Sequence, residues 1–492
     1  MARFKISNEE ITNKICQLVI KANRNLPSDV ISTLKKAKDR ERNTSARNIF
    51  DILLENARIS MEEGLPICQD TGIYVVFVEL GIDINIEKGF KDAINEGIRQ
   101  ATKKGFLRAS VCDPITRKNT FDNTPAIIHT NFCNHSGLKL TVLPKGCGSE
   151  NMSALKMLPP SSGLKGIADF VIDTVKKAGP NPCPPGIVGV GIGGTMEKAA
   201  YLSKKALLRP LEKSCAASMA VCELEKELLT KINSLGIGPQ GLGGDTTTLK
   251  VAIETSFCHI ASLPVAVNIQ CHAARKASST FINGEWHDMQ DMPSIDNFPN
   301  VNFLSSFKDA VKVKLPLKND EISNLKAGTW VLLSGPLLTG RDQTHKKLCE
   351  FIEKGQPLPV NLTDELIYYM GPSPAPPGKI IGSAGPTTSY RMDAYTPTIL
   401  QQGVRGLMGK GKRSEVVKRA IKRYGAVYFA TIGGAGALLS KAIKKCDLLA
   451  FKELGPEALF RLEVEDFPAI VINDSYGNDY YEMVETTTAL TI

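Results

Sequence analysis

Three kinds of sequence feature are missing from this chain of 492 residues, and each absence removes a class of protein. It has no run of 18 apolar residues, so no transmembrane helix is expected. The N-terminal stretch MARFKISNEEITNKICQLVI carries acidic residues early and lacks a small-residue cleavage site, so it is not expected to be a signal peptide. No two of the twelve cysteines are spaced as CxxC, which removes zinc ribbons, thioredoxin-like motifs and ferredoxin-type runs. We therefore expect a cytoplasmic protein with reduced thiols.

The charge balance is basic, with 60 Lys and Arg against 51 Asp and Glu, a net charge of +9. Part of the excess lies in residues 35–42 and 410–423. Such a surface is either simply solvated or suited to small anions or nucleic acid. Because no RNP-like aromatic motif, zinc-finger spacing or basic zipper accompanies the charge, we expect a small anionic substrate and no nucleic-acid partner.

The pattern of residues predicts two domains. In residues 1–277, helical apolar periods alternate with β-rich segments, and Ser7 and Glu10 have the spacing of a capping box, which predicts an α+β domain. A polar stretch with several Asp and Pro is predicted to be a linker over residues 278–305. Strands and helices then alternate over residues 306–492, which predicts a smaller α/β domain. The helices predicted there include SEVVKRAIKRYG and GALLSKAIKKC.

Three cysteines lie in predicted loops and not in helices or apolar surroundings. Cys68 lies in PICQDTG, Cys183 between prolines in NPCPPG, and Cys271 at the end of an apolar run in NIQCHAAR. Prolines and glycines prevent helix and strand continuation, so these thiols are expected on turns that a bulky cofactor can approach. Three such thiolates can hold three corners of an iron–sulfur cubane and leave the fourth iron open. The spacing also allows chance placement of loop cysteines.

Two other motifs offer competing explanations. Cys147, in KGCGSENM, is a rival ligand, although its glycine neighbours could instead form an anion-binding backbone nest. The stretch GVGIGG at residues 189–194 satisfies the GxGxxG pattern of dinucleotide-binding enzymes. The following segment is a long predicted helix, and Glu212 comes after it without a second strand. We therefore interpret these glycines as a turn that packs a helix on a strand.

Several stretches, taken together and in this order, resemble one family. They are PICQDTG, FLRASVCDP, KGCGSENMSAL, NPCPPGIVGVGIGGTMEKA, CHIASLPVAVNIQCHAAR, LLTGRDQTHKKL, GPTTSYRMD and GKGKRS. The chain resembles the iron–sulfur (class I) fumarate hydratases, whose relatives include L-tartrate dehydratase, over residues 10 to 490. The resemblance implies an α+β cluster-binding domain fused to a swivelling β/β/α domain, a [4Fe-4S] cluster and a homodimer. Cys147 falls where the family usually has another residue, so it is expected to be a bystander.

The resemblance also implies a role for individual residues. Cys68, Cys183 and Cys271 match the cluster ligands. Asp70 matches the proposed acid and Thr387 the proposed base. The residues that match the substrate pocket are Gln69, Arg108, Gly148, His259, Arg341, Arg391 and Lys410.

These roles suit the chemistry of a C4 dicarboxylate, which needs two anion clamps of the kind that Arg and Lys provide. A threonine is a weak base near pH 7, so Thr387 would need Arg341 or Arg391 nearby to lower its pKa. His259 could equally be an ordinary core histidine.

The expected activity is reversible hydration of fumarate to (S)-malate in the tricarboxylic acid cycle. Dehydration of L-tartrate and hydration of mesaconate are the alternatives within the same class. An iron-responsive nucleic-acid binder and a nicotinamide dehydrogenase built on GVGIGG are more distant ones.

Overall fold

The computed structural model describes residues 4–213, 215, 217–289, 293–298 and 307–489, and its N-terminal part contains two main β-sheets. The first has strand order β11-β10-β5-β2-β4 and the second β6-β9-β7-β8. The strands of the first sheet are β2 (Ile73–Gly81), β4 (Ile127–Cys133), β5 (Leu138–Lys145), β10 (Ala277–Ile282) and β11 (Glu285–Asp288). Those of the second are β6 (Ala154–Leu158), β7 (Gly186–Ile192), β8 (Thr248–Thr255) and β9 (Leu263–Gln270). A separate parallel pair consists of β1 (Phe4–Ile6) and β3 (Ile84–Ile86).

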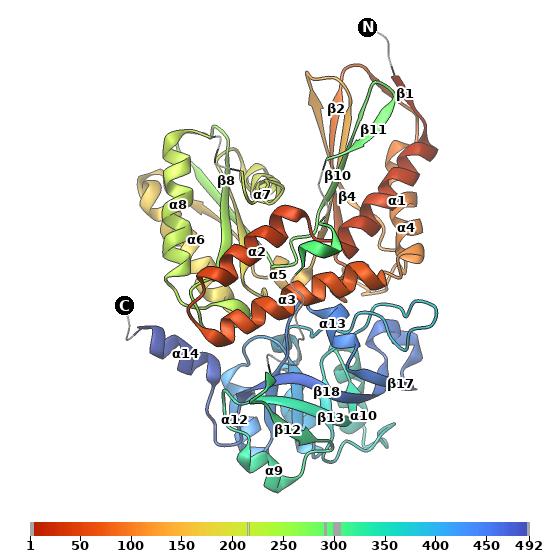
Figure 1. Cartoon of the computed structure of the whole chain (residues 1–492), viewed down its shortest axis with the longest axis vertical. Helices are drawn as coiled ribbons and strands as arrows, with labels where there is room; N and C mark the ends of the chain where they lie inside the picture. Colours follow the sequence, from red (N-terminus) through yellow and green to blue (C-terminus); the bar gives the residue numbers. More distant parts are fainter. Residues whose placement is uncertain (1–3, 214, 216, 290–292, 299–306, 490–492) are drawn as a thin grey trace.

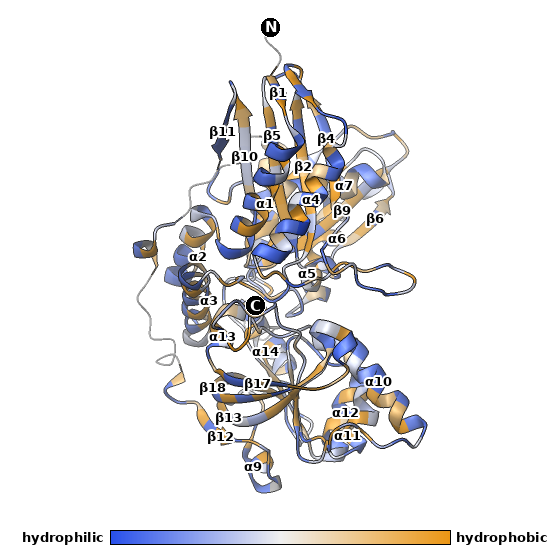
Figure 2. Ribbon diagram, turned by 90° about the vertical axis from the view of Figure 1, so that its right-hand side faces the viewer, coloured by the Kyte–Doolittle hydropathy of each residue, from blue (hydrophilic) through white to orange (hydrophobic). Residues whose placement is uncertain are grey.

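Helices pack on both sheets, and one helix lies between the sheets. The helices of the N-terminal part are α1 (Asn8–Arg24), α2 (Ser28–Arg40), α3 (Thr44–Glu63), α4 (Phe90–Lys104), α5 (Cys147–Glu150), α6 (Gly163–Ala178), α7 (Met196–Ala206) and α8 (Met219–Asn233). Helices α1 and α4 pack on the first sheet, and α6 and α8 on the second. Helix α7 lies between the sheets (Figure 1), where Tyr201 contacts Phe77 of β2. The predicted capping box is confirmed, since Ser7 and Glu10 exchange side-chain and backbone hydrogen bonds at the start of α1. Figure 2 shows the resulting pattern, with hydrophobic strands and helices of mixed character over them.

The C-terminal part contains a small closed β-barrel. Its strands are β12 (Val311–Lys314), β13 (Trp330–Thr339), β14 (Leu366–Tyr368), β15 (Gly406–Gly409), β16 (Val427–Ala430), β17 (Ile443–Ala450) and β18 (Leu459–Asn473). Strand β13 pairs with β14 on one side and with β18 on the other, which closes the ring β13-β14-β15-β16-β18. The pairing shifts register at Gly335, whose φ of 123° lets β13 bend. The helices of the C-terminal part are α9 (Asn319–Asn324), α10 (Asp342–Glu353), α11 (Thr396–Gln401), α12 (Glu415–Tyr424), α13 (Gly436–Ser440) and α14 (Tyr480–Ala489). The chain is therefore mixed α/β with a barrel at its C-terminal end.

Two sequence predictions need correction. The predicted linker over 278–305 begins with strand, because β10 and β11 occupy residues 277–288 at the edge of the first sheet. Serines of β10 form hydrogen bonds across the sheet, so a polar composition does not exclude a strand here. Parts of that segment, 290–292 and 299–305, lie outside the described residues. The helix predicted over GALLSKAIKKC ends at Ser440, and Ile443 already starts β17, which pairs with β18.

The GVGIGG stretch brings a helix close to a strand. A Cβ on Gly189 would lie 2.2 Å from the carbonyl oxygen of Ser203, and one on Gly191 would lie 2.0 Å from that of Ala199. Both carbonyls belong to α7, so these glycines let the helix backbone lie directly on β7. This agrees with the packing interpretation of the motif. Among the described residues, none of the helices is both long enough and apolar enough to cross a membrane.

Candidate active site

The PICQDTG turn lies at the boundary between the two parts of the chain. Helix α3 ends at Gly64 in a left-handed conformation, and the turn then leads into β2. The Ile67 amide donates to the carbonyl of Asn23 (2.9 Å), while the Ile67 carbonyl accepts from the Gly436 amide (3.0 Å) and from the Asn56 side chain (3.1 Å). Because Gly436 belongs to the C-terminal part, both parts of the chain fix the position of Cys68.

Asp70 is the centre of a charged hydrogen-bond network. Its Oδ1 accepts from Arg108 (3.0 Å) and from the Gly72 amide, and its Oδ2 accepts from the Cys147 amide (3.0 Å). The guanidinium of Arg275 donates to the backbone carbonyl of Asp70 at 2.8 Å. Burial opposes ionisation of Asp70, but Arg108 and Arg275 outweigh it and lower the pKa of the carboxyl group. Asp70 is therefore a carboxylate in this arrangement.

The three loop cysteines lie around one region. Cys68 and Cys183 are buried, and Cys271 is half-buried at the end of β9. Burial raises the pKa of the Cys183 thiol, Lys410 opposes this rise, and the charge of Cys271 adds to it for both Cys183 and Cys68. Burial is the main cause that raises the pKa of Cys68 to about 11. Lys410 Nζ lies 2.6 Å from Cys183 Sγ and supplies a cation beside it.

A glycine-rich stretch of the C-terminal part, Gly433, Gly434 and Gly436 with Ala435 among them, lies directly against these cysteines. A Cβ on Gly433 would lie 2.3 Å from Cys183 Sγ, and one on Gly436 would lie 3.2 Å from Cys68 Cα. A Cβ on Gly434 would lie 2.3 Å from Nε2 of His272, the neighbour of Cys271. Within the described chain, the three thiols do not form a group with all sulfur atoms within 4.8 Å. Ligands of a single ion converge more closely, whereas a multi-iron cluster is held at separate corners. Three thiols from separate loops are the kind of donor set that iron–sulfur clusters use.

Two arginines of the C-terminal part, Arg341 and Arg391, line the boundary and are called the arginine wall below. Arg341 lies 3.5 Å from Glu457, and its charge contributes to the lowered pKa of Asp70. Arg391 lies 3.4 Å from Asp342 at the start of α10. Among the described residues, Nε of Arg341 and Nε of Arg391 are buried with no hydrogen-bond partner. Buried donors without partners are costly, so these two Nε atoms are unsatisfied in the present arrangement.

Gly148, Thr387 and Lys410 complete the region. A Cβ on Gly148 would lie 2.9 Å from Lys410 Nζ, so the glycine lets the ammonium approach the backbone. Thr387 is buried, and its amide donates to the carbonyl of Tyr369 at 2.7 Å. The Gln69 side chain donates to the carbonyl of Pro386, directly before Thr387, at 3.0 Å. This hydrogen bond therefore joins the PICQDTG turn to the segment of Thr387 across the boundary.

The comparison with known proteins agrees with this geometry. The family model described as fumarate hydratase (fumerase) matches residues 12–280, and the one described as fumarase C-terminus matches residues 284–484. The chain belongs to the class I fumarate hydratase family.

Relatives in the family cover most of the chain. The aerobic fumarate hydratase class I of Escherichia coli (strain K12) is 32% identical over 88% of this chain and 82% of its own length. Fumarate hydratase 1, mitochondrial, of Leishmania major is 32% identical over 93% and 87%. A protein of Methanocaldococcus jannaschii named "Putative L(+)-tartrate dehydratase subunit alpha" is 44% identical over 54% of this chain and 96% of its own length. As a member of this family the protein is a hydro-lyase.

One residue predicted for the fumarate hydratase site is not brought to it. His259 is exposed in the loop between β8 and β9, and its Nδ1 accepts from the Ala261 amide at 3.1 Å. The neighbouring side chains of Phe257 and Ile260 are also exposed, at 103% and 91%. The remaining predicted residues lie along the boundary described above. Cys147 is exposed beside Asp70.

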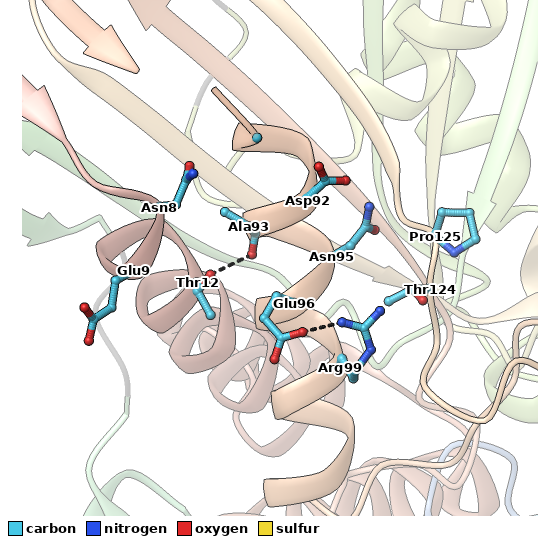
Figure 3. Close-up of a pocket in the computed structure, with 11 residues that line it drawn as sticks. Asn8, Glu9, Thr12, Asp92, Ala93, Asn95, Glu96, Arg99, Thr124 and Pro125 are labelled. Atoms are coloured by element: carbon cyan, nitrogen blue, oxygen red, sulfur yellow. Dashed lines mark hydrogen bonds and ion pairs between the residues drawn. The ribbon is translucent and has the colours of Figure 1, made fainter. Parts of the chain in front are cut away.

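A cavity elsewhere in this member of the family contains none of the predicted site residues. It has a volume of about 530 Å³, lies between α1 and α4, and includes Asn8, Asp92 and Glu96 in its lining (Figure 3). Glu96 pairs with Arg99 there, and none of the predicted site residues lines the cavity. The residues predicted for the site therefore lie at the boundary and not in this cavity.

Sequence reasoning missed three contributors to the boundary. Arg275, four residues after Cys271, is fully buried and binds the backbone of Asp70. Asn56 joins α3 to the C-terminal part, since its side chain bonds to Gly434 and to Leu438. His345 lies in the quoted motif LLTGRDQTHKKL, one helical turn after Arg341, and its Nε2 is buried without a partner in the described chain. Their spacing could have indicated two of them, because Arg275 is four residues after the predicted ligand Cys271 and His345 is four residues after Arg341.

Proposed function

We propose that the protein catalyses the reversible hydration of fumarate to (S)-malate, with Cys68, Cys183 and Cys271 as ligands of a [4Fe-4S] cluster. The observation that supports this most is that cations of the site contact both the thiols and the acid: Lys410 Nζ lies 2.6 Å from Cys183 Sγ, and Arg108 donates to both Asp70 and the carbonyl of Gly371. When bound, the cluster supplies an iron without a protein ligand, which acts as a Lewis acid toward the substrate's oxygen atoms.

The residues of the chain bind and orient the substrate. Arg108, Arg341, Arg391 and Lys410 offer cations from both parts of the chain, which suits the two carboxylates of a C4 substrate. Arg341 and Arg391 have free buried donors to use for this purpose. Gln69 holds the segment of Thr387 through the Pro386 carbonyl, and Gly148 leaves room for the ammonium of Lys410. Substrate bridging the two parts then excludes water between them.

Two residues transfer protons. In hydration Asp70, as the carboxylate that Arg108 and Arg275 favour, takes the proton of the water that adds at C2, and in the reverse direction it returns that proton to the departing hydroxyl. Thr387 donates its hydroxyl proton at C3 in hydration, and its alkoxide removes the C3 proton in dehydration, on the side of the C-terminal part. The swivelling motion expected of that part would bring Thr387 to the substrate. The part that moves would begin after β11, which still belongs to the first sheet.

Cysteine variants test the ligand set. Cys68→Ser, Cys183→Ser and Cys271→Ser should each remove both iron and activity after anaerobic reconstitution, whereas Cys147→Ser should keep both. Iron per chain and the visible absorbance are the measurements. If Cys147 proved essential for iron and Cys183 did not, the ligand set would be wrong.

L-Tartrate dehydration is the second candidate, because the relative with that name is 44% identical over 54% of this chain. The substrates differ by one hydroxyl group, so an assay of the reconstituted protein with fumarate, malate, mesaconate and the tartrates separates the candidates. A kcat/KM for L-tartrate above that for malate would overturn the assignment to fumarate.

We also propose a homodimer in the cytoplasm, with the chemistry serving the tricarboxylic acid cycle. The exposed Phe257 and Ile260 would be covered by a second copy, and His259 between them could reach substrate only in such an assembly. Analytical ultracentrifugation of the holoenzyme tests this proposal. Phe257→Asp should convert the dimer to monomer, and a sedimentation coefficient unchanged from wild type would contradict it.

A further inference from the structure

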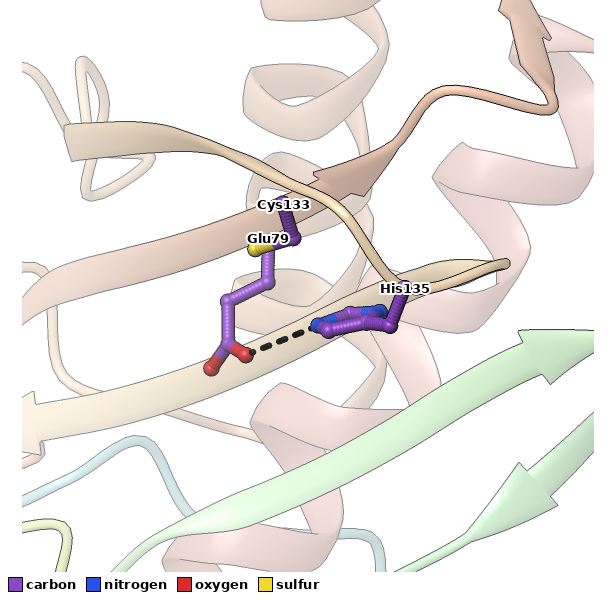
Figure 4. A group of neighbouring side chains, drawn as sticks. All are labelled: Glu79, Cys133 and His135. Atoms are coloured by element: carbon purple, nitrogen blue, oxygen red, sulfur yellow. Dashed lines mark ion pairs between the residues drawn. The ribbon is translucent and has the colours of Figure 1, made fainter.

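A second group of potential metal ligands lies on the first sheet, away from the cysteines of the active site. Glu79 is near the end of β2, Cys133 ends β4, and His135 follows in the turn to β5 (Figure 4). One ligand atom from each of these side chains lies within 4.8 Å of the other two. Strands β2 and β4 run parallel with Gly81 opposite Cys133, so backbone pairing fixes this convergence.

The surroundings of His135 favour a cation at its second ring nitrogen. Nδ1 lies 3.2 Å from the carbonyl oxygen of Ser136, so the tautomer that donates from Nδ1 leaves a lone pair on Nε2. That lone pair faces Oε2 of Glu79 at 3.7 Å. Two acceptors that face each other need a proton or a metal ion between them. A ring nitrogen held by a backbone carbonyl is also the usual support of a metal-binding histidine.

The carboxylate is supported in the same manner. Lys139 Nζ lies 2.8 Å from Oε1 of Glu79, which leaves Oε2 free to bind a metal ion between it and His135. Hydrogen bonding of the distal oxygen orients a monodentate carboxylate ligand. Cys133 is half-buried, and its sulfur lies 3.9 Å from the carbonyl oxygen of Asn131, a weak contact that does not engage its lone pairs.

We propose that Glu79, Cys133 and His135 form a binding site for a zinc ion, separate from the cluster and open to solvent at its fourth position. Zinc takes a thiolate, an imidazole and a carboxylate in one tetrahedral site. One thiolate and one carboxylate balance the charge of the ion. Ligand atoms of a tetrahedral zinc lie roughly 3.3–3.8 Å apart, so small side-chain rotations close the present arrangement.

The site is distinct from the active site by its place on the sheet. Strand β2 has 9 residues, which corresponds to roughly 30 Å, and PICQDTG precedes its first residue whereas Glu79 lies near its last. Zinc here would fasten the turn after β4 to the end of β2. It would stabilise the sheet edge and take no part in hydration.

Zinc and iron counted together in the reconstituted holoenzyme test the proposal. Wild-type protein, Cys133→Ser and His135→Asn are dialysed against buffered free zinc, and both metals are measured by inductively coupled plasma mass spectrometry. Cys446→Ser and His287→Asn are the matched controls, a half-buried strand cysteine and an exposed strand histidine.

Wild type and controls should bind one zinc per chain beyond any zinc held elsewhere, and each ligand variant should bind it at least roughly 100-fold more weakly. Iron per chain should stay constant, which shows that the variants are folded and that the loss concerns this site alone. Equal zinc affinity in wild type, Cys133→Ser and His135→Asn would overturn the proposal. Loss of zinc together with loss of iron in both ligand variants would also overturn it, because the effect would then be general.

Discussion

Replacement of Gly433 by alanine is the sharpest single test of how the two parts of the chain meet. Gly433 belongs to the C-terminal part and Cys183 to the N-terminal part, and a new methyl group would lie 2.3 Å from the cysteine sulfur. It would also lie 2.9 Å from Cδ of Lys410 and 3.2 Å from the side-chain oxygen of Gln240. Ordinary contact begins at 3.4 Å, so the thiol or the glycine loop must move by about 1 Å.

The size of the effect follows from packing energetics. Overpacking of this kind typically costs about 1–3 kcal/mol. Three neighbours are displaced together, so we expect a cost near the upper end, about 3 kcal/mol. This cost opposes the position of the Cys183 thiol that binds the cluster. At about 1.4 kcal/mol per factor of ten, the reconstituted variant should lose iron to a chelator roughly 100-fold faster than wild type. Hydratase activity should fall in proportion to the iron.

Gly355→Ala is the matched control, because nothing lies within 4 Å of its added Cβ. Its φ of 63° makes it the more strained substitution of the two, so it separates backbone strain from crowding at the thiol. Circular dichroism should show both variants folded. If Gly433→Ala lost iron at the wild-type rate, the thiol of Cys183 would not lie against this loop in the loaded enzyme, and the reasoning would be refuted.

Two further variants probe chemistry and stability. Thr387→Ala should lower kcat by roughly two to four orders of magnitude with little change in KM and full iron content, as expected for loss of a general base; a near-normal kcat would remove that assignment. Burial opposes ionisation of Glu150, but Lys145 and Lys204 outweigh it and lower the pKa of the carboxyl group from 4.5 to about 2. The resulting stabilisation is present above pH 4.5 and is lost as the pH falls through 2. After allowance for solvent screening, Glu150→Gln should therefore lower the free energy of unfolding by about 2 kcal/mol at pH 7. The loss should be smaller at pH 3. Urea unfolding at both pH values is the measurement, and an equal loss at the two values would contradict the ion-pair explanation.

The sequence predicted the positions of the cysteines because prolines and glycines around them act locally. Cys183 has a positive φ of 58° and follows a turn closed by the Pro180 carbonyl, as its proline neighbours indicated. The helical period in SNEEITNKICQLVIKAN and its capping box were equally local and are confirmed.

Features that depend on packing between distant segments were not accessible. The glycines at 433–436 are typical of an ordinary loop until Cys183 and Cys68 are placed against them. Barrel closure depends on the pairing of β13 with β18, which lie far apart in the sequence. Strand β10 was hidden because its serines are satisfied by hydrogen bonds across the sheet and not by an apolar face. The exposed position of His259 also required the structure, since the sequence suggested either a substrate contact or a core histidine.

The boundary between the two parts also bears on how the active site assembles. The tartrate dehydratase relative from Methanocaldococcus jannaschii, whose name is that of one subunit, matches only 54% of this chain. Here both parts belong to one polypeptide, so contacts such as Lys410 with Cys183 form within a molecule. A covalent connection replaces the concentration of a separate partner by an effective concentration, on the order of millimolar for short flexible linkers. Dilution to nanomolar enzyme therefore does not separate the arginine wall from the cysteines, whereas a two-chain enzyme would depend on the affinity between its subunits.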